Sequence, residues 1–284
     1  MGRYRKILVA FDGSASSANA LRQAINLARA EQSWIKVVAV VPTFEGEIEI
    51  IGVRDVDAVI KGPAEKLIAE AKAIAKAEGA SILTDVEHGE AYERIVDVAS
   101  AENCDLIVMG RSGHGRVARA FVGSVTARVI GHTDRDVLVV PATATVGWGR
   151  ILVATDGSRY STVAVEHAMN IAALLGSELT VVAVADVNEE FYAQAPDEAE
   201  KVVMKAKAIA EEVAKRATEA GVKATALVKE GEPYEAITAA AAATKAEIIV
   251  MGSHGRTGLK RLLMGSVTEK VIGHAACPVL VTRL

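Results

Sequence analysis

Residues 251–272 read MGSHGRTGLKRLLMGSVTEKVI, and residues 109–130 read MGRSGHGRVARAFVGSVTARVI. Each stretch has a glycine, a second glycine three residues on, and a Gly-Ser pair ten residues beyond that. A short β-branched run precedes the first glycine, and apolar residues at helical spacing follow the Gly-Ser pair. A strand, a glycine-rich turn and a helix in this order indicate an α/β fold.

The repetition extends over the whole chain of 284 residues. ILVAFDGS at Ile7–Ser14, for example, returns as ILVATDGS at Ile151–Ser158. This is a tandem duplication of one unit of about 140 residues, which is the usual size of one domain. We expect domains at residues 1–142 and 150–284, joined by a short linker of small and polar residues at 143–149.

Each copy alternates strand-like and helix-like periodicity. In the first copy the strand-length runs are KILVAF, IKVVAVV, SILTDVE, DLIVMG and DVLVVP, which we take as apolar throughout. Helical spacing lies between them, with Ser, Asp or Gly as expected caps, at residues 14–31, 63–79, 91–102 and 124–131. The alternation predicts one doubly wound, parallel, five-stranded Rossmann-like sheet per copy, covered on both faces. The stretch 44–63 has no counterpart of equal length and is expected to be a surface excursion.

Composition excludes several classes of protein. Apolar residues make up 51% and charged residues 24%, so the chain can bury a full core. The net charge of −4 does not favour a nucleic-acid or membrane-surface binder, and no apolar run has the length of a membrane span. The N-terminus lacks the features of a signal peptide, and the two cysteines occupy non-equivalent places outside any CxxC. We therefore expect a reduced, cytoplasmic protein.

The glycines of the second copy have the spacing of a phosphate cradle. In an open α/β sheet, ligands bind at the carboxyl ends of the strands, where Gly252 and Gly255 are expected. Glycine there allows positive φ and close backbone approach. A helix then begins near Ser266 or Thr268, and its free N–H groups form an anion site. The intervening loop adds basic side chains, Arg256, Lys260 and Arg261.

The first copy has the same parts. Its glycines and Gly-Ser pair are accompanied by three arginines, giving Gly110, Gly113, Gly123 and Ser124 with Arg111, Arg116 and Arg119. Turn residues alone would explain one occurrence, but two at identical spacing favour phosphate binding.

Two further positions fit a nucleoside. Asp12 and Asp156 close the first strand of each copy, where a carboxylate can accept hydrogen bonds from a ribose or a base. The aspartates are equally suited to cap the following helix. Val40 and Val184, after the second strand, can supply an apolar wall for a base.

Together these motifs resemble the ATP-binding subgroup of the universal stress protein family (UspA-like), whose fold is adenine nucleotide alpha hydrolase-like. The resemblance rests on Gly-x2-Gly-x9-Gly-Ser after IVMG and on the ILVAxDGS start of each copy, with the CPVLV end of the second. It implies that Asp and Val hold adenosine, while the glycines and Gly-Ser hold the phosphates, usually with Mg²⁺. It also implies an internal pseudo-dimer, in which Val137–Val140 pair with Val279–Thr282 and cover two sheet edges.

Carried over residue by residue, the resemblance gives two nucleotide sites. The site in the first domain comprises Ala10, Asp12, Val40, Met109, Gly110, Arg111, Gly113, His114, Gly123, Ser124 and Val125. The site in the second domain comprises Ala154, Asp156, Val184, Met251, Gly252, Ser253, Gly255, Arg256, Gly265, Ser266 and Val267.

The first copy departs from the family pattern more than the second. It has Phe11 where the second copy has Thr155, and its loop has Gly115 instead of a counterpart to Gly258. Ala10 and Ala154 stand where some ATP-binding relatives carry a proline. The departures suggest a first site that binds more weakly or holds a different nucleotide.

The sequence therefore predicts an ATP-binding stress-response regulatory protein. No catalytic set or metal-ligand spacing is apparent, and no GxxxxGK[ST] motif occurs. One alternative is a slow ATPase or an autophosphorylating enzyme, using Ser124, Ser266 or Thr268. Another is a structural or chaperone-like partner protein that binds no nucleotide. The expected partners are an adenine nucleotide and an unidentified protein, with no nucleic acid or membrane, and a homodimer of the tandem chain is allowed.

Overall fold

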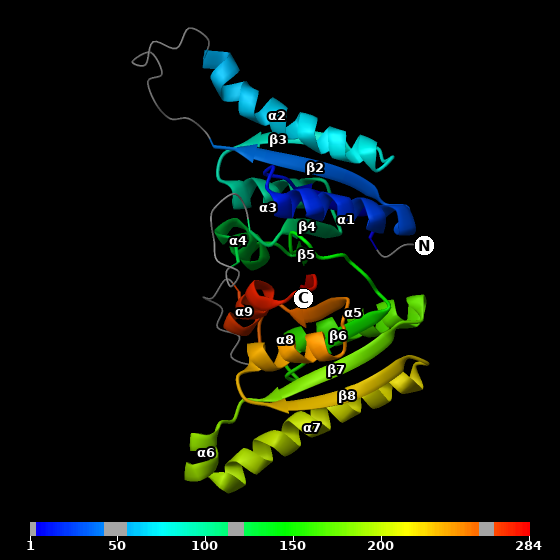
Figure 1. Ribbon diagram of the computed structural model, residues 1–284, viewed down its shortest axis with the longest axis vertical. Coiled ribbons are helices and arrows are strands. Elements are labelled where there is room, and N and C mark those ends of the chain that lie inside the picture. The colour runs from blue at the N-terminus through cyan, green and yellow to red at the C-terminus, as the bar shows by residue number, and fades with distance from the viewer. Residues whose placement is uncertain (1–3, 43–55, 113–121, 256–263) are drawn as a thin grey trace. The chain divides into compact units, whose positions relative to one another are not determined.

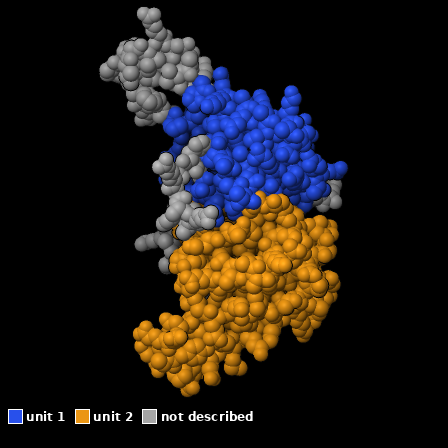
Figure 2. Space-filling view, in the orientation of Figure 1, with its two compact units in different colours: residues 1–116, 123–135, 140–143 blue, residues 117–122, 136–139, 144–284 orange. Residues whose placement is uncertain are grey.

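The computed structural model describes residues 4–42, 56–112, 122–255 and 264–284. The chain divides into two compact units (Figure 2). The first contains the described residues of 1–116, 123–135 and 140–143, and the second those of 117–122, 136–139 and 144–284.

The first unit begins with a strand–helix alternation that follows the predicted order (Figure 1). Its strands β1, β2, β3 and β4 are parallel and lie in the order β3-β2-β1-β4. The elements are β1 (Lys6–Ala10), α1 (Ala15–Glu31), β2 (Trp34–Val41), α2 (Val56–Ala77), β3 (Leu83–His88), α3 (Ala91–Ala101), β4 (Leu106–Gly110) and α4 (Ser124–His132). The strand β5 (Asp136–Val140) follows.

The second unit repeats this order, with one additional short helix after its second strand. Its parallel strands lie in the order β8-β7-β6-β9-β10. The elements are β6 (Arg150–Ala154), α5 (Arg159–Leu175), β7 (Glu178–Ala185), α6 (Glu189–Gln194), α7 (Pro196–Glu219), β8 (Lys223–Glu230), α8 (Pro233–Ala243), β9 (Ile248–Gly252), α9 (Ser266–His274) and β10 (Val279–Thr282).

The strand order fixes which helices share a face of each sheet. From β1 to β3 the chain steps one way along the sheet, and it then returns to β4 on the other side of β1. Right-handed crossovers in opposite directions put their helices on opposite faces, so α1 packs with α2 and α3 packs with α4. The predicted doubly wound sheet is confirmed. The order reverses between β1 and β4, and between β6 and β9, which is where ligands bind in such sheets.

The final strands pair as the family resemblance implied. Residues 137–139 of β5, which belong to the second unit, run antiparallel to residues 279–281 of β10. Every residue of both strands is buried. The expectation that all strands are apolar was wrong for β3 and β8, because each lies at the outer edge of its sheet and is partly exposed along its length.

Serine caps open the first helix of each unit. Ser14 Oγ accepts the N–H of Ser17, and Ser158 Oγ accepts the N–H of Ser161.

The helix predicted at 63–79 was placed too late: α2 begins at Val56, and Pro63 lies inside it. Proline costs no hydrogen bond in the first turn of a helix, and for that reason the sequence favoured a helix start at Pro63. In the structure Pro63 is instead the eighth residue of α2. Residues 44–55 of the predicted surface excursion lie outside the described residues.

Among the described residues, no helix combines the length and the apolar character needed to cross a membrane. Cys104 and Cys277 are both free thiols.

Candidate functional site

The centre of the second unit's site is the turn that leaves β9. The N–H of Gly265 donates to the carbonyl O of Ser253 over 2.9 Å, which joins the start of α9 to the end of β9. Thr268 Oγ1 donates to the carbonyl O of Gly252, also over 2.9 Å, and ties the first turn of α9 to the strand. The N-cap residue Gly265 offers no side-chain acceptor, so the cap does not occupy the first N–H groups of α9. These groups carry the partial positive charge of the helix N-terminus.

The glycines are required because neighbouring atoms pack closely against them, and not because their backbone φ angles are positive. Positive φ was one predicted reason for Gly252 and Gly255, and it was wrong: neither has it. A Cβ on Gly252 would lie 2.7 Å from the backbone carbonyl of Tyr160, and one on Gly255 would lie 3.0 Å from Asp156 Oδ2. A Cβ on Gly265 would lie 3.2 Å from the carbonyl O of Ser253. Any larger residue would therefore push on β9, on α5 or on the Asp156 carboxylate.

Asp156 lies at the carboxyl end of β6 and shapes the turn into α5. Its Oδ1 accepts the N–H of Ser158 over 2.9 Å. The alternative that Asp156 caps α5 was wrong, because the cap is Ser158, two residues later. One carboxylate oxygen of Asp156 thus supports the turn, while Oδ2 is the atom nearest the space beside Gly255.

A cavity of about 460 Å³ opens at this point, on the carboxyl ends of β6, β7 and β9. Its lining contains nine residues that the sequence assigned to the second nucleotide site: Ala154, Asp156, Val184, Met251, Gly252, Gly255, Gly265, Ser266 and Val267. The fold thus brings together residues from four separate segments of the chain.

Of the other two predicted residues, one is described, and it is not in this lining. Ser253 is fully buried, and its Oγ lies 3.1 Å from His254 Nδ1. Its place in the turn matters through the backbone carbonyl that Gly265 binds. Arg256 lies outside the described residues, as do Lys260 and Arg261 of the basic loop.

The cavity also has walls that the sequence reasoning did not assign to it. Val182, Val184 and Asp186 alternate along β7 and just beyond its end, and all three line the cavity. Strand alternation from Val184 would have identified the other two, since i and i+2 share a face. Thr268 belongs to the helix start that the sequence predicted. The remaining residues come from loops and helices, and no local pattern marks them: Thr155, Ser161, Val202, Pro233, Ile237 and His254.

The first unit has the same local framework. The Gly123 N–H donates to the carbonyl O of Arg111 over 2.8 Å, and Thr126 Oγ1 donates to that of Gly110 over 3.1 Å. A Cβ on Gly110 would lie 2.8 Å from Ser16, as Gly252 meets Tyr160. Asp12 Oδ1 accepts the N–H of Ser14 over 3.0 Å, so here too the aspartate is not the cap.

The other predicted residues of the first site are placed as follows. Burial lowers the pKa of the Arg111 guanidinium, which stands at the position of Ser253. Ala10 and Met109 are buried at strand ends, and Val40, Ser124 and Val125 keep some exposure. Gly113, His114, Arg116 and Arg119 lie outside the described residues. Phe11, in the position of Thr155, is buried in the core.

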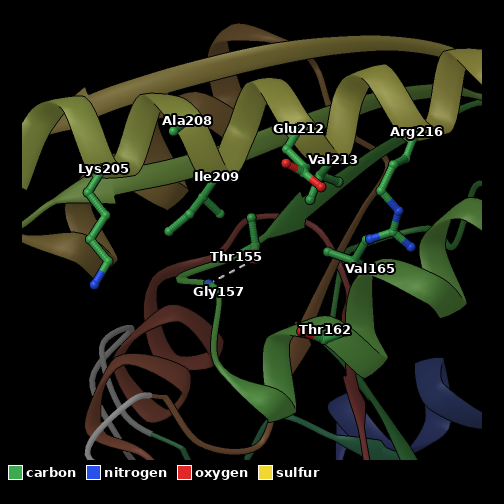
Figure 3. A pocket seen from close by; sticks show the side chains of 10 residues that line it. All are labelled: Thr155, Gly157, Thr162, Val165, Lys205, Ala208, Ile209, Glu212, Val213 and Arg216. Carbon is green, nitrogen blue, oxygen red and sulfur yellow. Dashed lines mark hydrogen bonds between the residues drawn. The ribbon is translucent and has the colours of Figure 1, made fainter.

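Thr155 lines both this cavity and a second, smaller hollow in the same unit, which Figure 3 shows. This hollow of about 270 Å³ lies between α5 and α7, and Figure 3 shows Glu212 turned into it. Ile209 from α7 packs over Gly157, 3.0 Å from where a Cβ would lie. The guanidinium of Arg216 is already paired with Glu166. None of the described residues that were assigned to a nucleotide site lines this hollow.

The larger cavity has the chemistry of a site for an anion attached to an apolar ring system. It offers valine side chains on β7, a carboxylate on β6, and helix N–H groups with hydroxyls at α9. Within the described part of the chain, no group of three His, Cys, Asp or Glu side chains is placed to hold a metal ion.

Both halves of the chain resemble known proteins. Residues 3–141 and 147–283 each match the universal stress protein family. A universal stress protein of Methanocaldococcus jannaschii is 41% identical over 138 residues, covering 47% of this chain and 81% of its own. One from Mycobacterium tuberculosis is 26% identical over 309 residues, covering 98% of this chain and 95% of its own.

A solved structure has the same fold over the whole length. The crystal structure of a universal stress protein from Archaeoglobus fulgidus superimposes with a TM-score of 0.75 at 22% identity. The match covers 98% of this chain and 96% of that one.

Proposed function

Because this chain belongs to the universal stress protein family, we propose that it is an ATP-binding regulatory protein. The second domain provides the better-formed nucleotide site. One observation carries the proposal: nine residues assigned to a nucleotide from sequence line a single cavity at the switch point of the sheet.

The order of the strands supports one orientation of the nucleotide. Across the sheet, β7 lies on one side of β6 and β9 on the other. The adenine would lie against Val182 and Val184, the ribose beside Asp156, and the phosphates over the turn from Gly252 to Ser266. Of the two carboxylates of the cavity, Asp186 follows β7 on the adenine side, whereas Asp156 lies between the two ends, beside Gly255.

Mg²⁺ would be bound mainly through the nucleotide. Mg²⁺ with ATP is commonly held by one or two protein oxygens together with phosphate oxygens and water. The hydroxyl of Ser266, at the first position of α9, is the described group best suited to assist it. The ion would neutralise phosphate charge, while the chain's own residues bind and orient the ligand.

The regulatory role rests on the position of the site. Gly255 and Gly265 both line the cavity, although nine residues separate them in the sequence. A nucleotide that binds the backbone at both positions would favour one conformation of this turn by its differential affinity. A protein partner that recognises that conformation would then report nucleotide occupancy.

The direct test is calorimetric titration of the nucleotide-free chain with Mg-ATP, followed by Ser266→Asp. A carboxylate at that position repels the phosphates, so we expect loss of one binding event. Ser124→Asp, the equivalent change in the first domain, is the matched control and should leave the second site intact. Binding by Ser266→Asp that equals wild type would overturn the assignment.

The same preparation separates the alternatives. Incubation with γ-labelled ATP should leave the label on the nucleotide if the protein only binds. Free phosphate or labelled protein above a protein-free blank would favour an enzyme. A wild-type chain that takes up no Mg-ATP would favour a structural or chaperone-like role.

A further inference from the structure

A stack of side chains joins α8 to α9 in the second unit. The ring of Tyr234, in the first turn of α8, lies with its centroid 4.8 Å from that of His274 at an interplanar angle of 46°. Lys270 Nζ stands 4.8 Å from the same centroid. His274 and Lys270 are one helical turn apart on α9, so a single tyrosine of α8 contacts two successive turns of α9.

Two polar contacts complete this stack. The Lys270 ammonium pairs with the carboxylate of Glu232, the N-cap residue of α8, over 2.9 Å. His274 Nδ1 lies 2.8 Å from the carbonyl O of Lys270. Since a carbonyl can only accept, Nδ1 carries the proton, and this bond fixes the ring in the orientation that meets Tyr234. We call Glu232, Tyr234, Lys270 and His274 the α8–α9 clamp.

The first unit has the same clamp between α3 and α4. Tyr92 and His132 are again 4.8 Å apart at 46°, and the Arg128 guanidinium lies 3.9 Å from the Tyr92 centroid. Glu90 pairs with Arg128 over 3.1 Å. Neighbouring positions differ between the two copies, as at Ala91 and Pro233 or Ala127 and Glu269. The same clamp contacts therefore occur in both copies, although residues next to the clamp differ between them.

Both helices that the α8–α9 clamp joins also line the large cavity. Pro233 and Ile237 of α8 form part of its wall, and so do Ser266, Val267 and Thr268 in the first turn of α9. Pro233 is adjacent in sequence to Tyr234, while the clamp residues of α9 are Lys270 at its middle and His274 at its last position. A helix of nine residues is about 13 Å long, so a small change at its far end tilts its first turn.

The tyrosine hydroxyl plays no part in joining the helices. Tyr234 OH donates to Glu235 and Tyr92 OH donates to Glu93, each the next residue on the same helix. The contact between the helices is made by the ring alone, through edge and face attraction to the imidazole and the cation. A phenylalanine would keep this contact, whereas an alanine would remove it.

We propose that the α8–α9 clamp is a positioning device, which holds the N-terminal turn of α9 against α8 and so sets the affinity of the cavity for a phosphate-bearing ligand. Tyr234 is its central positioning residue and does not touch the ligand. The inference rests on the proposed nucleotide site for its affinity readout, and a second readout needs no ligand.

The experiment compares Tyr234→Ala, Tyr234→Phe and Tyr92→Ala with wild type. Amide hydrogen exchange in the nucleotide-free chain should be faster in residues 269–274 of Tyr234→Ala and unchanged there in the other two. Mg-ATP affinity at the second site should fall about threefold to tenfold in Tyr234→Ala alone, because a clamp contact of this kind is worth about that factor. Tyr92→Ala is the matched control, since it removes the same contact from the other unit.

Unchanged exchange in α9 of Tyr234→Ala would overturn the clamp whether or not ATP binds. Faster exchange with unchanged ATP affinity would overturn its role in the site. Loss of affinity in Tyr234→Phe equal to that in Tyr234→Ala would also contradict it, because the ring contact remains. If wild type binds no ATP, the nucleotide proposal fails, and the exchange result alone decides whether the clamp holds α9.

Discussion

The Oδ2 atom of Asp156 stands 3.0 Å from the point where a Cβ on Gly255 would lie. The carboxylate at the end of β6 and the second glycine after β9 thus share one edge of the cavity. This relationship explains a glycine with ordinary backbone angles in the turn: it leaves room for the carboxylate and for whatever that carboxylate binds.

Gly255→Ala should weaken nucleotide binding at the second site by about tenfold, since a methyl group displaces the Asp156 carboxylate from its partners. The overall stability should change little, because the displaced group is the end of a side chain. Calorimetric titration with Mg-ATP measures the effect. Gly62→Ala is a control, since a Cβ there meets nothing within 4 Å. Equal affinities in the two variants would show that Gly255 is only a turn residue.

Gly252→Ala should destabilise the second unit itself. A Cβ there would lie 2.7 Å from the backbone C and O of Tyr160, which cannot move without shifting α5. Overpacking against backbone costs about 1–3 kcal/mol, visible as a lower urea midpoint. A midpoint within error of wild type would mean that β9 and α5 can separate freely.

The first unit has an ion network centred on Lys36 and Glu102. Lys36 contacts Glu102 at 2.9 Å and Asp85 at 3.0 Å, and Lys6 also contacts Glu102. The hydrogen bond to Lys36 is the main cause that holds the pKa of Glu102 below its usual range. In the second unit, Thr180, Leu227 and Thr244 stand at the positions of Lys36, Asp85 and Glu102, and they line a small hollow together with Arg150, Glu178 and Thr225.

Glu102→Gln should therefore lower stability at pH 7 but not in acid. A carboxyl whose folded pKa is depressed adds stability above its unfolded pKa, about 4.3, and loses it as the pH falls through the folded value. Urea unfolding at pH 7 and at pH 3 checks this difference. Glu198→Gln, which removes an exposed pair with Lys201, is the control and should have less effect at either pH. A Glu102→Gln deficit that persists in acid would rule out the ionic explanation.

Cys277 should resist alkylation in the folded protein. Burial raises the pKa of its thiol to about 11, so the thiolate fraction at pH 8 is roughly two hundred times smaller than for a thiol of pKa about 8.5. Iodoacetamide labelling followed by mass spectrometry should be slow at pH 8, should rise toward pH 10, and should be fast in urea. Rapid labelling of the native chain at pH 8 would contradict this burial.

Much of the fold could be predicted because strand and helix periods are local properties. The alternation, the parallel sheets and the start of α9 at Ser266 followed from residues close together in the chain. The limits of α2 did not, because Pro63 is an ordinary helix-start signal and its place inside a longer helix depends on packing against the sheet. The reason for Gly252 also needed the structure, since Tyr160 is distant in sequence.

The sequence by itself determined that one glycine-rich pattern occurs twice and which strand ends carry it. Only the tertiary structure decided that Pro233 and Ile237 join the cavity of the second unit, and that Ser253 is fully buried outside its lining. The contacts of the α8–α9 clamp also depend on the tertiary structure, because its members span residues 232–274. The physical reason is that periodicity sets which face a side chain occupies, whereas contacts between elements depend on how crossovers stack them.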